Sequence, residues 1–145
     1  MCRGIFIFLV LAFGCASPAE DWTGNRAANV CISGFDDEQA ATVAAAVDEW
    51  RESDSSVALH VSADEPCELS ISATTFTGMK AGDQIFDEIR LDHRLYIDAF
   101  HVAVLHELGH FLTGPAHSSA EDDVMFPDYL GQTGLTAADV ARLHR

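Results

Sequence analysis

The chain has 145 residues, 48% of them hydrophobic, and a formal net charge of −15 at pH 7. This length predicts a single domain, and the share of apolar residues suffices for a buried core, which excludes a disordered chain. The acidic balance excludes a nucleic-acid binder, because such a protein needs positive charge against the phosphates, and we interpret it as a solvated surface.

The start of the chain has the pattern of an export signal. Arg3 precedes an apolar run from Ile5 to Phe13, which has the size of a signal peptide and is too short to span a bilayer as a helix. The segment AFGC, which ends at Cys15, resembles a bacterial lipoprotein signal, although Ala12 stands where leucine is usual. Cleavage before Cys15 would leave that cysteine to be lipidated.

This pattern divides the chain into three expected parts. Residues 1–14 are predicted to be a signal peptide of the lipoprotein type, residues 15–28 a small and polar tether, and residues 29–145 the functional domain. Ordinary secretion without a lipid is one alternative, and a retained, buried segment is another. The first two interpretations predict an exported protein, in the cell envelope or secreted, whose only link to a membrane is an N-terminal lipid anchor.

Two of the four cysteines belong to the expected domain. Cys31 and Cys67 form an even pair in a compartment that permits oxidation, so a disulfide between them is predicted. The alternative is two buried free thiols. Zinc binding by these cysteines is not expected, because neither belongs to a CxxC pair.

The first elements predicted for the domain are a strand over 30–33 and a helix over 35–52. Asp36 can cap this helix, and Gln39 three residues later completes a capping-box pattern. Apolar side chains at i, i+4 and i+7 give the helix one buried stripe, which consists of Val43, Val47 and Trp50.

Alternating apolar residues then predict three strand segments, over 56–62, 67–76 and 84–92. In the third segment the apolar alternation changes phase, and we interpret this segment as a hairpin arm or a strand. Residues 77–83 separate the last two segments and contain two glycines, which is typical of a turn.

A second long helix is predicted over 98–114, with Asp98 as its cap and Gly114 at its end. Its expected apolar face consists of Phe100, Val104, Leu108 and Leu112. A long irregular stretch follows, and Thr136 with Asp139 begins a short final helix. The order of elements predicts an α+β (α/β-like) fold: a mixed, mostly parallel twisted sheet, two long helices and a small C-terminal helical part.

The second helix carries the motif HELGH, which can place two imidazoles on one metal ion. His106 and His110 lie four residues apart, slightly more than one helical turn, so both rings project from nearly the same face. Glu107 lies about 100° around the helix axis from His106, where it can sit beside a metal without binding it and accept a proton from a water. Zinc that performs catalysis needs a third protein ligand, and His117 follows three residues after Gly114.

This region resembles the metzincin zinc peptidases, specifically the matrixins, whose pattern is HExxHxxGxxH followed by a methionine turn. His106, Glu107 and His110 match the first part, and VMFP around Met125 resembles the Met-turn. Pro127 and Tyr129 match the Pro-x-Tyr segment that forms the wall of the S1′ pocket, which receives the substrate side chain just after the cleaved bond.

The resemblance implies a zincin-type catalytic domain in which Zn²⁺ is bound by three histidines, including His117, above Met125. This chain has one more residue than the family pattern between the second histidine and the glycine, because Phe111, Leu112 and Thr113 all precede Gly114. If the extra residue moves His117 away, either of two carboxylates in the following loop is a substitute ligand, or the site has two protein ligands; these carboxylates are Asp122 and Asp123.

Several features of animal matrixins have no counterpart here. No activation segment with a switch cysteine is evident, and neither are the family's calcium and structural-zinc loops. Asp92 with His93 is a candidate for a contact with an ion or with a ligand of the metal. The four histidines outside the motif are assigned to the surface or core; these are His60, His93, His101 and His144.

The function predicted from this region is a secreted, monomeric zinc endopeptidase that acts on peptide or protein substrates. A metal-activated water attacks the peptide bond, and Glu107 serves as general base. The alternative is an exported lipoprotein binding module that keeps a zinc site without turnover. A third hypothesis is a zinc amidohydrolase with a small or cell-wall substrate.

Overall fold

The computed structural model describes residues 11–12, 24–64 and 66–145. Most of the expected leader lies outside the described residues, and so does Cys15, which follows it. Ala27 and Ala28, which the sequence assigns to the tether, are the first two residues of strand β2 and pair with strand β3.

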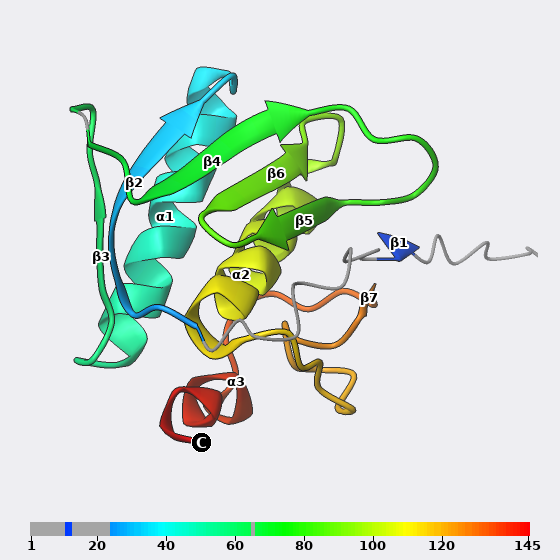
Figure 1. Cartoon of the computed structure of the whole chain (residues 1–145). Coiled ribbons are helices and arrows are strands. Elements are labelled where there is room, and N and C mark those ends of the chain that lie inside the picture. The colour runs from blue at the N-terminus through cyan, green and yellow to red at the C-terminus, as the bar shows by residue number, and fades with distance from the viewer. Residues whose placement is uncertain (1–10, 13–23, 65) are drawn as a thin grey trace, which may run out of the picture.

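The fold is built on a five-stranded sheet in the order β3-β2-β4-β6-β5. Four of its strands are mutually parallel, and β5 is the antiparallel strand at one edge (Figure 1). The predicted mixed, mostly parallel sheet is confirmed. The bounds are Ala27–Ser33 for β2, Ala58–Val61 for β3, Leu69–Thr74 for β4, Gly82–Ile85 for β5 and Glu88–Asp92 for β6.

Two 17-residue helices, α1 (Asp37–Ser53) and α2 (Ile97–Thr113), pack against the same face of this sheet (Figure 1). The chain after α2 runs beneath that helix as seen in Figure 1. It contains the short strand β7 (Asp128–Tyr129), helix α3 (Ala137–Ala141) and a 3₁₀ turn, Arg142–His144. Strand β7 pairs antiparallel with Leu11–Ala12 (β1).

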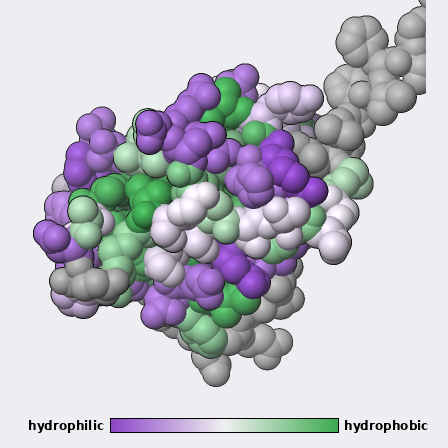
Figure 2. Space-filling view, turned by 90° about the horizontal axis from the view of Figure 1, so that it is seen from above, coloured by the Kyte–Doolittle hydropathy of each residue, from purple (hydrophilic) through white to green (hydrophobic). Residues whose placement is uncertain are grey.

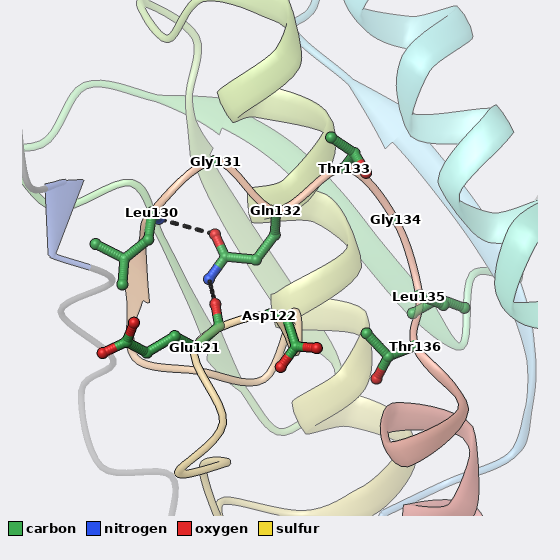
Figure 3. A pocket seen from close by; sticks show the side chains of 9 residues that line it. All are labelled: Glu121, Asp122, Leu130, Gly131, Gln132, Thr133, Gly134, Leu135 and Thr136. Carbon is green, nitrogen blue, oxygen red and sulfur yellow. Dashed lines mark hydrogen bonds between the residues drawn. The ribbon is translucent and has the colours of Figure 1, made fainter.

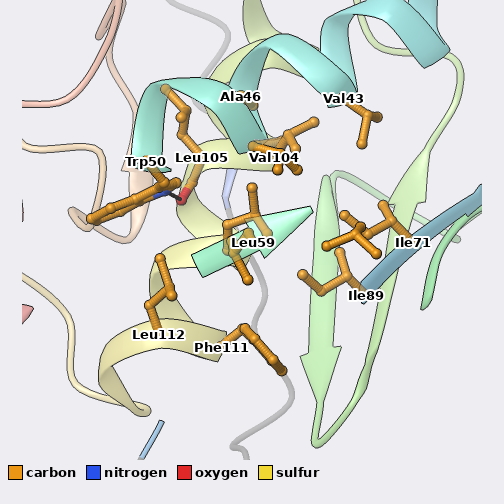
Figure 4. Close-up of a cluster of buried hydrophobic side chains, with 14 of the residues drawn as sticks. Val43, Ala46, Trp50, Leu59, Ile71, Ile89, Val104, Leu105, Phe111 and Leu112 are labelled. Carbon is orange, nitrogen blue, oxygen red and sulfur yellow. Dashed lines mark hydrogen bonds between the residues drawn. The ribbon is translucent and has the colours of Figure 1, made fainter. Parts of the chain in front are cut away.

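The core lies between the two helices and the sheet (Figure 4). The predicted stripe of α1 is fully buried there, and the Nε1 of Trp50 donates a hydrogen bond of 3.0 Å to the carbonyl oxygen of Leu105 in α2. Every residue of α2 from Ala99 to Leu112 is buried except His101, so the helix is covered on all sides and not only along its predicted apolar face. This position explains how α2 can present polar motif residues to a protected site.

Helix α1 begins as predicted, whereas α2 does not. Asp36 caps α1 by accepting a hydrogen bond from the backbone N–H of Gln39, but the Gln39 side chain donates to the carbonyl oxygen of His93 and does not close the capping box. The prediction that Asp98 caps α2 is wrong: the cap is Tyr96, and Asp98 lies in the first turn. A carboxylate there still interacts favourably with the helix dipole.

The segment predicted as a turn over 77–83 ends two residues earlier than expected. Gly82 and Asp83 already belong to β5, and the segment over 84–92 divides into the end of β5 and all of β6. A tight turn joins the two strands, with Phe86 at a φ of 54°. This turn is the physical reason for the phase change in the apolar pattern.

The Cys31–Cys67 disulfide is present, and it links β2 to the segment that leads into β4 across 36 residues of sequence. Closing a loop of this length restricts the unfolded chain and stabilises a domain by about 4 kcal/mol. The face shown in Figure 2 carries mostly hydrophilic side chains interrupted by hydrophobic patches. Within the described residues, no helix combines the length and apolar character needed to cross a membrane.

Asp92 at the end of β6 anchors the loop that precedes β5 and forms an ion pair with Arg94. Its carboxylate accepts hydrogen bonds from the Arg94 side chain, the Arg94 backbone and the Phe76 backbone. The hydrogen bond from the Arg94 side chain is the main cause that lowers the pKa of Asp92 to about 2. Because the unfolded value is 3.8, the folded state gains stability from the ionised form above that pH.

We therefore expect the free energy of unfolding to fall by about 1 to 2 kcal/mol as the pH drops from about 4 to 2. Urea unfolding at several pH values measures this dependence, and Asp92→Asn should flatten that part of the profile. Asp48→Asn, which removes an exposed ion pair with Arg51 on α1, is the matched control. The expectation fails if the two variants have the same acid profile.

Candidate active site

Helix α2 brings three motif residues into the interior of the domain. His106, Glu107 and His110 are all buried, with at most 1% of their surface exposed. These side chains are buried because the sheet, α1 and the C-terminal segment surround the helix. The ring centroids of the two histidines lie 4.7 Å apart.

His117 joins these two histidines from the loop that follows α2. Its ring centroid lies 5.2 Å from that of His106 and 4.8 Å from that of His110. One candidate ligand atom from each histidine lies within 4.8 Å of the other two, a cluster that could hold a metal ion. The three predicted ligand residues are therefore together in the fold.

The extra residue before Gly114 is absorbed at the end of the helix. Thr113 remains helical, and the N–H of Gly114 still donates to the carbonyl oxygen of His110. Gly114 then takes a φ of 91°, which is left-handed and favours glycine, and turns the chain back toward the site. One further residue of helix followed by this turn brings His117 beside the other two rings.

Carbonyl oxygens fix the orientation of the two helical imidazoles. The Nδ1 of His106 lies 2.6 Å from the carbonyl oxygen of Val124, and the Nδ1 of His110 lies 3.1 Å from that of Gly114. When both Nδ1–H groups donate to these oxygens, both Nε2 atoms carry lone pairs, and these atoms lie only 3.1 Å apart. Two facing lone pairs are the arrangement that a shared cation stabilises, so the residues fit a metal ion.

Burial favours the neutral form of the two helical imidazoles, the form that binds zinc, whereas His117 is exposed. Burial lowers the pKa of His110 to about 4 and lowers that of His106 well below 6.5. Desolvation is also the main cause that lowers the pKa of His117, assisted by the charge of Arg142. The side chain of Arg142 also donates to the carbonyl oxygen of Ala116, which fixes the loop next to His117.

Glu107 faces the edge strand β5. A Cβ atom on Gly82 would lie 3.0 Å from the Glu107 Cγ and 3.1 Å from its Oε1, so the glycine permits the close approach. Burial raises the pKa of Glu107 to about 8, and the nearby Asp83 carboxylate raises it further whereas Lys80 lowers it. Asp83 is itself buried and accepts hydrogen bonds from Lys80 and Arg90. A carboxyl group with this pKa exchanges protons near neutral pH, as a general base must.

Met125 lies against the helix beneath the histidines, where the sequence placed the Met-turn. Its Sδ atom would lie 2.1 Å from a Cβ on Gly109, so the glycine inside HELGH provides the space for it. The turn is tied to the C-terminal helix by Asp139, which is fully buried. The Asp139 carboxylate accepts from the backbone N–H groups of Val124 (3.0 Å), Met125 (3.2 Å) and Thr136 (3.0 Å).

Replacing Gly109 by alanine is expected to lower the free energy of unfolding by about 2 kcal/mol, because the new methyl group overlaps Met125 and crowds Trp50. Thermal denaturation of the zinc-free domain measures the effect. Gly78→Ala is a control for loss of a glycine, since a Cβ there meets nothing within 4 Å, although its φ of 79° brings some strain. An unchanged Tm in Gly109→Ala would contradict the contact.

The substitute ligands and the histidines outside the motif do not join the metal cluster. Asp123 is buried and accepts hydrogen bonds from Ser118 and Thr136, and Asp122 is exposed at the surface. The ring of His101 lies beside Glu49, and that of His144 lies beside Asp54. The ring of His93 contacts Thr75, and His60 is exposed.

The predicted pocket wall adjoins a loop that ends at the final helix. Pro127 and Tyr129 are partly buried, and Tyr129 packs against the hydrophobic core. The loop over 130–136 encloses the Gln132 amide and borders a hollow of about 530 Å³ that Glu121 and Asp122 also line (Figure 3).

Sequence patterns did not reveal four of the residues that shape this site. Gly82 and Asp83 were assigned to a turn, and no local pattern connected them with Glu107. Gly109 was counted only as a spacer within HExxH, and Asp139 only as half of a capping box. The predicted capping box is present, but its carboxylate also holds the turn at Met125.

Comparison with protein families decides which group the site belongs to. The family model described as matrixin, a peptidase family, matches residues 19–145. The chain belongs to the matrixin family. Matrixins are zinc-dependent metallopeptidases, so the matrixin domain described here has the fold and the histidine cluster expected for that class.

Solved structures agree on the fold of this matrixin. A crystal structure of myroilysin is similar with a TM-score of 0.68 at 12% sequence identity, covering 91% of this chain and 89% of that one. A second structure of myroilysin has a TM-score of 0.64 at 10% identity, covering 91% of this chain and 95% of that one. No curated protein matches the chain significantly.

Proposed function

We propose that this matrixin is an exported zinc endopeptidase, with His106, His110 and His117 as metal ligands and Glu107 as general base. The observation that carries the proposal is the gathering of three imidazoles around one point, next to a buried carboxyl group with a pKa of about 8. A site that served only to hold a metal would have no use for such a base.

Zn²⁺ bound by the three histidines would supply a Lewis acid that polarises the scissile carbonyl group. Glu107 takes a proton from the attacking water and later transfers it to the leaving amine. Asp83 and burial keep the affinity of Glu107 for that proton high. The carbonyl oxygens of Val124 and Gly114 orient the two helical imidazoles, so little rearrangement is needed during the reaction.

We propose that the substrate lies extended between β5 and β7. Strand β5 is the edge of the main sheet, beside Glu107, and an edge strand offers unpaired backbone groups to a peptide. The backbone of β7 accepts an extended neighbour, since Leu11–Ala12 pairs with it. Met125 supports the site from below, and Pro127 with Tyr129 forms the wall of the S1′ pocket.

We further propose that residues 1–14 are removed on export, that Cys15 carries a lipid, and that the domain works as a monomer in the cell envelope. The Cys31–Cys67 disulfide supports an oxidising compartment outside the cytosol. Mass spectrometry of the mature protein tests the lipid at Cys15, and an unmodified N-terminus would favour secretion in soluble form.

The deciding experiment combines zinc analysis of the purified domain with cleavage of a peptide library. We expect about one zinc per chain and cleavage that a chelator abolishes. Zinc with no cleavage of any peptide would favour a binding module, and cleavage restricted to small amides would favour an amidohydrolase. Absence of zinc binding would overturn all three hypotheses: the endopeptidase, the binding module and the amidohydrolase.

A His117→Ala variant tests the third ligand separately. Its zinc affinity is expected to fall by at least about a hundredfold, because loss of even an outer partner of a ligand costs about ten- to a hundredfold. His60→Ala removes an exposed histidine from β3 and is the matched control. Equal zinc affinity in the two variants would remove His117 from the proposed ligand set.

A further inference from the structure

We propose that a recess beside Tyr129 is the S1′ subsite and that Asp98 makes it select peptides with lysine or arginine at P1′, the residue just after the cleaved bond. This inference rests on the proposed peptidase function and goes beyond it by naming the substrate class. The prediction from sequence gave Asp98 only a capping role, which the structure assigns to Tyr96.

The recess has a volume of about 130 Å³ and is lined by residues of α2, β7 and the following loop; these are Asp98, His101, Tyr129, Gln132 and Thr133. A water molecule occupies about 30 Å³ of liquid, so the space suits one slender, unbranched side chain. The recess adjoins the proposed pocket wall, because Tyr129 belongs to both. His101 in its lining lies five residues before His106 on α2, a rise of about 7.5 Å along the helix axis. A long side chain that starts beside the cluster can reach it.

The lining of this recess has the charge to bind a cation. Among the described residues, no cationic side chain is paired with Asp98, and its charge contributes, after burial, to the raised pKa of Tyr129. The only basic group in the lining is His101, and its Nε2 already lies 3.2 Å from the Oε2 of Glu49. A lysine or arginine side chain would therefore meet an unneutralised carboxylate at Asp98.

The loop that closes the recess is fixed in place before any substrate binds. The Gln132 amide donates to the carbonyl oxygen of Glu121, and its oxygen accepts from the N–H of Leu130 (Figure 3). The same amide nitrogen also donates to the carbonyl oxygen of Asp128. The backbone N–H of Leu135 donates to Glu49 at 2.8 Å. A preformed recess discriminates more sharply than a mobile one, because less ordering free energy is lost on binding.

The test uses zinc-loaded enzyme and peptides that are identical except for lysine, norleucine or glutamate at P1′. Norleucine has the length of lysine without the charge. We expect kcat/KM to be about threefold higher for lysine than for norleucine, because Asp98 is exposed and water screens its attraction for a cation, and lowest for glutamate.

Asp98→Asn is expected to reduce the lysine-to-norleucine ratio to about one, and Asp98→Glu should retain most of it. The matched control is Asp37→Asn, which changes the corresponding first-turn acid of α1 and should keep the wild-type ratio. A wild-type ratio near one, or a ratio that Asp98→Asn leaves unchanged, overturns the specificity while the peptidase function stands. No cleavage of any of the peptides overturns the function and the specificity together.

Discussion

Replacing Glu107 by glutamine is expected to lower kcat for peptide cleavage by about a hundred- to ten-thousandfold while zinc binding is kept. The glutamine has the same shape but cannot take a proton from the attacking water, and general-base catalysis contributes about that factor. Because Glu107 lies beside the three histidines and is not one of the proposed ligands, the metal content should stay near that of the wild type. Steady-state kinetics with a fluorogenic peptide and metal analysis measure the two quantities.

Glu38→Gln makes the same chemical change at an exposed position on α1 and should leave kcat unaffected. Full activity in Glu107→Gln would exclude the general-base role. A large loss of zinc in the same variant would instead indicate that Glu107 contributes to metal binding.

Replacing Asp139 by asparagine is expected to lower the free energy of unfolding by about 3 kcal/mol and to weaken zinc binding about tenfold or more. The carboxylate accepts three backbone N–H groups in the interior, and the amide of asparagine would present donors to some of them. Two of the three belong to Val124 and Met125, and the carbonyl oxygen of Val124 orients His106. The substitution should therefore disturb His106 indirectly, through the backbone of Val124.

Urea denaturation and a zinc-competition titration measure the two effects of Asp139→Asn. Asp36→Asn is the matched control, because asparagine is as good an N-cap as aspartate and the capping bond to Gln39 can be kept. Equal stability and equal zinc affinity in the two variants would contradict the role of Asp139.

Local patterns predicted most of the elements because each depends on neighbours in sequence. The helix stripe of Val43, Val47 and Trp50 follows from the helical period, and Thr136 with Asp139 caps a helix within three residues. The errors have physical causes as well. Gly82 resembles a turn residue because glycine permits turns, yet in the fold it provides space for Glu107 beside an edge strand.

The sequence by itself determined the unit of His106, Glu107 and His110, since one helical turn fixes how those side chains project. It also determined the even cysteine pair and the order of strands and helices. Only the tertiary structure decided that His117 reaches the same point despite the additional Thr113, because Gly114 turns the chain back after the helix. The tertiary structure also placed Asp83 near Glu107 and joined Asp139 to the turn at Met125. These contacts join segments 14 or more residues apart, and no local spacing encodes them.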